Sequence, residues 1–130
     1  MQTIEIRQRF DSEIALARFA KFERVFNADL EDIEVLEAFV VKPDGTKTPV
    51  NAADIKKRLT PQAEAAPAFS SLKTILIEFK NLKLGDAVAF KYQIRSHKPV
   101  FERSFSEMEV FTSLFNWKSI EVNLSAPADF

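Results

Sequence analysis

The residues that could carry out catalysis are few and scattered along this chain. His97 is the only histidine, and no cysteine is present, so a catalytic histidine would need a serine nucleophile. A Gly-x-Ser-x-Gly nucleophile elbow does not occur, since Gly45 and Gly85 are the only glycines. We therefore expect His97 to be an exposed or structural residue, and we predict no catalytic residues and no enzymatic activity of the chain itself.

Acidic residues gather between positions 31 and 37, where Glu31, Asp32, Glu34 and Glu37 suggest a metal site at first sight. Calcium sites need oxygen ligands at close alternate positions around a glycine-bearing turn, and this group has no such turn. The pattern favours a solvated acidic edge. Phosphate-binding glycine motifs are absent, and nothing selects two of the nineteen acids as a glycosidase pair. We predict no metal and no cofactor.

Aromatic residues are the feature with a serious functional alternative. The carboxy-terminal third contains Phe101, Phe105, Phe111, Phe115 and Trp117. Core filling is the favoured interpretation, with only Trp117 partly exposed. The alternative is a surface patch that stacks on sugars or binds a partner. The candidate ligand or partner contacts are Trp117, Phe115 and Phe101.

The composition limits the classes of protein to which the chain can belong. The 130 residues carry a formal net charge of −1, which gives no electrostatic case for nucleic acid or an anionic membrane. No apolar run approaches the roughly 18 residues that span a bilayer. With 46% hydrophobic residues and 13 Phe, the chain can build one domain with a hydrophobic core, and we assign residues 1–130 to it. The ending SAPADF is typical of the start of a connection, so we expect a piece of a longer protein.

Alternating apolar residues predict a mainly β fold. The expected strands cover residues 3–10, 33–41, 72–80, 87–95, 104–111 and 120–124, the fifth with a break near Ser106. Residues 12–26 read either as one helix or as a helical turn followed by a strand, and the second interpretation is favoured. With no long helix and no internal repeat, the pattern indicates an antiparallel β-sandwich with one or two short helical turns.

The stretch Ile33–Val50 organises this prediction. Pro43-Asp44-Gly45 lies between two extended runs and predicts a hairpin with a type I′ turn. We expect both faces of the first strand to be covered, with one face formed by Ile33, Val35, Phe39 and Val41 and the other by Leu36, Ala38 and Val40.

The segment after this hairpin reads as irregular. Residues 51–59 are consistent with one or two helical turns that Pro61 ends. Residues 60–71 read as a loop that Phe69 docks onto the domain.

Four stretches together resemble a known bacterial family: VLEAFVVKPDGTKTPV (35–50), APAFSSLKTILIEF (66–79), LGDAVAFKYQIR (84–95) and KPVFERSFS (98–106). The family is a domain of unknown function at the N-terminus of exported transglutaminase-like proteins. The chain departs from the family pattern at Ser71, at Lys80 and at Glu102-Arg103, which lie in or next to predicted loops.

The resemblance implies an extracytoplasmic β-sandwich module, periplasmic or on the cell surface. In that family the domain stands upstream of a core with a Cys-His-Asp arrangement, as in transglutaminases and papain-like proteases. It implies a non-catalytic accessory or scaffold domain, with the downstream domains of the same chain as partners. The alternative is a peptide- or glycan-binding module that uses the aromatic residues.

Overall fold

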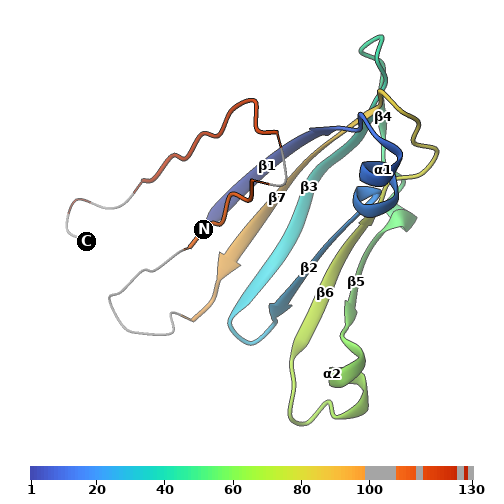
Figure 1. Cartoon of the computed structure of the whole chain (residues 1–130). Helices are drawn as coiled ribbons and strands as arrows, with labels where there is room; N and C mark the ends of the chain where they lie inside the picture. Colours follow the sequence, from blue (N-terminus) through green and yellow to red (C-terminus); the bar gives the residue numbers. More distant parts are fainter. Residues whose placement is uncertain (99–107, 114–115, 126–127, 129–130) are drawn as a thin grey trace. The chain divides into compact units, whose positions relative to one another are not determined.

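The computed structural model describes residues 1–98, 108–113, 116–125 and 128. The chain divides into two compact units, residues 1–98 and 99–130, and each is described by itself. Within the described residues, all helices and strands belong to the first unit (Figure 1). In chain order they are β1 (Gln2–Arg9), α1 (Glu13–Phe19), β2 (Lys21–Asn27), β3 (Glu31–Val41), β4 (Lys47–Pro49), η1 (Ala52–Asp54), β5 (Ile55–Leu59), α2 (Pro61–Ala65), β6 (Leu72–Glu78) and β7 (Ala87–Ser96).

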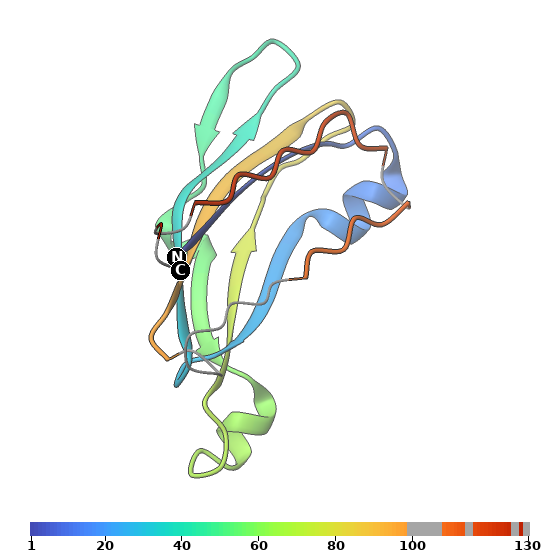
Figure 2. The ribbon, with the colours of Figure 1, turned by 90° about the vertical axis from the view of Figure 1, so that its left-hand side faces the viewer.

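Two antiparallel sheets make up this unit, as the sequence predicted. The first sheet has the strand order β1-β7-β3-β4, and β1, β7 and β3 run side by side in Figure 1 and Figure 2. The second sheet has the order β2-β6-β5. The only α-helices in the described part of the chain are the short α1 and α2, so the fold is mainly β.

The core lies where the inner faces of the two sheets meet. On β7, which the sequence predicted as a strand, the alternation is regular, and Val88, Phe90, Tyr92 and Ile94 are all buried. The ring of Phe22 from β2 lies 4.7 Å from that of Phe90 and 5.1 Å from that of Tyr92, measured between centroids. Since these rings belong to different sheets, their packing joins the sheets directly.

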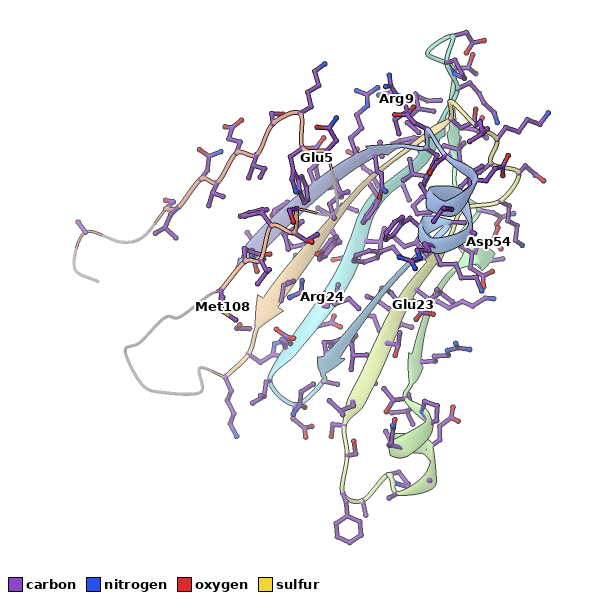
Figure 3. The ribbon with its side chains drawn as sticks, in the orientation of Figure 1. Glu5, Arg9, Glu23, Arg24, Asp54 and Met108 are labelled. Carbon is purple, nitrogen blue, oxygen red and sulfur yellow. The ribbon has the colours of Figure 1, made fainter. Side chains whose placement is uncertain are left out.

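The favoured interpretation of residues 12–26 is confirmed. Ser12 caps α1, and its hydroxyl oxygen accepts a hydrogen bond from the Ala15 amide at 3.1 Å. The chain then enters β2, where exposed and covered positions alternate. Figure 3 shows the consecutive residues Glu23 and Arg24 on opposite sides of this strand.

Strand β3 differs from its prediction. The pairing register with β7 shifts between Val35 and Glu37, so β3 contains a bulge at Leu36. Ile33 packs into the core before the bulge, and Ala38 and Val40 are buried after it. Assigning Val35 and Phe39 to one face was therefore wrong, because an inserted residue exchanges the two faces of a strand.

The hairpin turn is not type I′. The Lys42 carbonyl accepts from the Gly45 amide at 2.9 Å, and only Gly45 in this turn has a positive φ, of 88°. Pro43 fixes its own φ near −65°, which type I′ forbids at that position. The turn is instead type I followed by a glycine in the left-handed region, and the Asp44 carboxylate accepts from the Thr46 amide at 2.9 Å.

The prediction for residues 51–71 was wrong in three places. Ile55–Leu59 forms strand β5, which pairs with β6, while only Ala52–Asp54 is helical. Pro61 begins α2 instead of ending a helix, because the first helical position needs no amide donor. Phe69 does not dock the loop, since its side chain is 93% exposed.

The last two predicted strands are not found in the described residues. Residues 108–111 and 120–124 have no regular secondary structure, and residues 104–107 lie outside the described part. Ile120, Val122 and Leu124 are 46–80% exposed. An alternating pattern of apolar residues does not by itself form a strand, because a strand needs backbone hydrogen bonds to a neighbouring strand.

An ion pair between the buried Asp86 and the partly exposed Lys42 holds the start of β7. The Asp86 carboxylate accepts hydrogen bonds from Lys42 Nζ at 2.6 Å and from the Lys83 amide at 2.9 Å. Its backbone carbonyl accepts from the Phe10 amide at 2.9 Å, next to β1. Lys42 keeps the pKa of Asp86 below its ordinary value, although burial opposes this shift.

We predict that Phe90→Ala lowers the free energy of unfolding by about 3–5 kcal/mol, because the substitution leaves a cavity against Phe22 and Phe79. Urea denaturation measures this change. Val25→Ala is the matched control, since Val25 is 56% exposed and its truncation should change stability by less than about 0.5 kcal/mol. Equal effects of the two substitutions would contradict the assigned core.

We predict that Lys42→Met lowers the free energy of unfolding by about 1–2 kcal/mol at neutral pH, because Asp86 stays buried and charged without its cation, although solvent reaches part of the Lys42 side chain and screens the pair. The folded-state pKa of Asp86 is depressed, so the pair stabilises the fold above about pH 4 and this contribution disappears as the pH falls through that pKa. The difference between wild type and variant should therefore shrink in acid.

Denaturation curves at several pH values between neutral and about pH 3 measure this dependence. Lys118→Met is the control, since Lys118 is exposed and forms no ion pair among the described residues. A difference between wild type and Lys42→Met that does not vary with pH would rule out the pair as its source.

Candidate functional site

The aromatic candidates fall partly within the described residues. Trp117 is 46% exposed, and Phe111 is exposed to the same extent, although the sequence favoured burial for Phe111. Their rings meet edge to face, with centroids 5.8 Å apart and an interplanar angle of 89°. Phe101, Phe105 and Phe115 lie outside the described residues.

The orientation of the Trp117 indole is fixed inside the second unit. Its Nε1–H donates a hydrogen bond of 2.8 Å to the Thr112 carbonyl oxygen. This bond and the Phe111 contact hold the ring while nearly half of the side chain meets solvent. Such a ring can stack on a sugar or an apolar side chain, but it supplies no acid, base or nucleophile.

His97 has no catalytic arrangement around it in the described residues. The side chain is exposed, and its backbone amide donates to the Leu30 carbonyl at 2.8 Å, which ties the end of β7 to the β2–β3 connection. A general base needs a proton donor within hydrogen-bonding reach, and no such contact of the imidazole is found here.

The acidic group divides in the structure. Asp32 accepts a hydrogen bond of 2.7 Å from Lys57 on β5, and this bond is the main cause that lowers the pKa of Asp32, against the opposing effect of partial burial. Glu34 and Glu37 project into solvent. Within the described residues, no group of three or more His, Cys, Asp or Glu side chains lies close enough to hold a metal ion.

Sequence reasoning missed an apolar depression of about 260 Å³ in the first unit, which we call the β3 depression. It lies where the β3 bulge faces the segment after β4. Its lining is Val35, Leu36, Glu37, Ala38, Phe39, Pro49, Val50, Ala52 and Ile55. The lining comes from β3 and from residues 49–55, so the depression depends on how these two stretches fold against each other and not on a spacing motif. Apart from Glu37 the side chains are apolar, so the depression can hold an apolar group.

Comparisons with known proteins agree with this architecture. Residues 3–130 match the model of a family described as a domain of unknown function with a solved structure, DUF3857. No curated protein matches the chain. None of the helices in the described part of the chain is long and apolar enough to cross a membrane.

One solved structure is similar in fold. It is the crystal structure of a "putative protease" from Parabacteroides distasonis, with a TM-score of 0.62 and 20% sequence identity. The alignment covers 77% of the present chain and 20% of the other chain. The chain therefore spans about a fifth of the length of that protein.

Proposed function

The chain belongs to the DUF3857 family of domains of unknown function, and from this we propose that it is a non-catalytic accessory domain of a larger exported protein. The catalytic core of that protein would be transglutaminase-like, with a Cys-His-Asp arrangement. The accessory domain would support this core or present a substrate or partner to it. Its location would be the periplasm or the cell surface.

The observation that carries this proposal is the lack of a nucleophile system. The 130 residues contain no cysteine, so a cysteine nucleophile has to come from another part of the protein. In the described residues, the exposed imidazole of His97 has the Asp32 carboxylate as a charged neighbour, but no hydroxyl that it could activate is hydrogen-bonded to it. The chain also resembles in fold about a fifth of a longer protein described as a "putative protease". This is the relation expected of an accessory domain that stands beside a catalytic core.

A second candidate function is recognition of a peptide or glycan through aromatic side chains. The half-exposed Trp117, held by its Nε1 hydrogen bond and by Phe111, favours this function. An aromatic ring that is already ordered loses little conformational entropy when it stacks on a ligand.

We predict that the purified chain has neither amine-transfer nor peptidase activity, and that a longer protein containing it loses stability or substrate capture when residues 1–130 are deleted. Turnover of a labelled amine and of a peptide library measures the first outcome, and thermal melts and pull-downs measure the second. Turnover by the chain alone that disappears in His97→Ala would overturn the non-catalytic assignment.

We predict that Trp117→Ala weakens any binding of peptidoglycan fragments or peptides at the aromatic pair by about tenfold or more, since stacking is worth roughly 1–3 kcal/mol per ring. Trp117 is the only tryptophan, so quenching of its fluorescence reports contact directly. Phe69→Ala is the matched control, because Phe69 is an exposed aromatic of the first unit. Unchanged fluorescence across both ligand sets would count against this second function.

A further inference from the structure

In the described residues, β3 and β5 each have an edge that is not hydrogen-bonded to a neighbouring strand over most of its length, and an ion pair links the two strands. β3 pairs with β7 along its length but with β4 only over Phe39–Val41, and the Ala38 carbonyl accepts a hydrogen bond from the Val50 amide at 2.9 Å, so residues 31–37 have strand pairing on one side. β5 is the outer strand of the second sheet. The 2.7 Å ion pair between Asp32 of β3 and Lys57 of β5 links the two strands. An unpaired strand edge is a template for the addition of another strand.

The β3 depression lies at this edge. Val35 and Ala38 line one side of it, and Ala52 and Ile55, at the start of β5, line the other. Leu36, at the bulge, is 44% exposed. An extended segment added along β3 would therefore place an apolar side chain over the depression, with its backbone beside that of β3.

The negative charge along this edge favours a positively charged partner. Glu34 and Glu37 are exposed, and neither forms an ion pair with a described residue. Lys91, which stands opposite Glu37 in the register, forms its ion pair with Glu5 at 3.6 Å. The neighbouring acids Asp32 and Asp54 already have the lysine partners Lys57 and Lys80. Two carboxylates thus remain available to a partner's cations.

We propose that the edge of β3 from Ile33 to Glu37, beyond the Asp32–Lys57 ion pair, binds an extended, cationic segment of a partner protein. The segment adds as a strand beside β3, inserts one apolar side chain into the β3 depression and places Lys or Arg side chains beside Glu34 and Glu37. Backbone hydrogen bonds supply affinity in this mode, and the depression and the carboxylates supply specificity. Lipid phosphates and nucleic acids are disfavoured by the same negative charge. This site does not depend on the catalytic core proposed above.

The first test is a titration of the ¹⁵N-labelled chain with a peptide of about eight residues that alternates valine and lysine, long enough for a typical strand. We expect amide shifts confined to residues 31–39 and 50–55. A peptide that alternates valine and glutamate should produce none of them. A third peptide has the valine–lysine sequence with alternate backbone amides N-methylated. It keeps the side chains but loses backbone hydrogen-bond donors, so it should bind more weakly than the unmodified peptide.

Variants of the chain separate this site from the rest of the surface. Glu37→Lys should weaken binding of the valine–lysine peptide by about tenfold or more, because it replaces an attraction by a repulsion. Ala52→Trp should also weaken binding, since it fills the depression. Glu23→Lys is the control, because Glu23 is an exposed acid on β2 (Figure 3) without an ion pair among the described residues.

Thermal melts of each variant separate loss of binding from loss of the fold. Binding that is unchanged in Glu37→Lys would overturn the proposal. Equal binding of the glutamate peptide, full binding of the N-methylated peptide, or shifts only outside residues 31–39 and 50–55 would overturn it as well.

Discussion

Packing of the Phe22 ring between Phe90 and Tyr92 is the contact on which the first unit depends. The chain has no cysteine, so no disulfide bond ties the two sheets together. Their faces are held by apolar burial, and Phe79 extends the same group of rings from the end of β6. The Arg24 guanidinium donates to the Tyr92 hydroxyl at 3.3 Å, so the polar end of that ring is satisfied between the sheets. Everything else in the unit is positioned by the two sheets that these side chains join.

The bulge in β3 follows from one residue that cannot enter this core. An uninterrupted alternation from Ile33 and Val35 would bury Glu37, and a buried carboxylate without a partner costs several kcal/mol. The bulge at Leu36 turns Glu37 to solvent and brings Ala38 to the core. It also opens the lining of the β3 depression, so the depression and its acidic rim have a common physical cause.

Prediction from the sequence succeeded for strands in which apolar and polar residues alternate over the whole length. β1, β2 and β7 alternate without interruption, and their inner faces follow directly from residue type. It failed for β5, because residues 55–59 form a strand through their register with β6, which no local pattern displays. It failed for the turn because Asp-Gly was given more weight than the φ restriction of Pro43. In the candidate site, the exposure of Trp117 was predicted, whereas its bond to Thr112 depends on backbone geometry.

The acidic residues show why function is harder to predict than fold. Asp32, Glu34 and Glu37 read alike in the sequence, yet Asp32 is neutralised by Lys57 across the two sheets while both glutamates stay available. The distinction lies in a contact between residues 25 positions apart. The Asp32–Lys57 pair ties one end of β3 to β5, whereas Glu37 at the bulge is exposed and forms no ion pair with a described residue. Binding specificity on this edge therefore comes from which carboxylates the fold leaves unpaired, and that is decided by packing between the sheets.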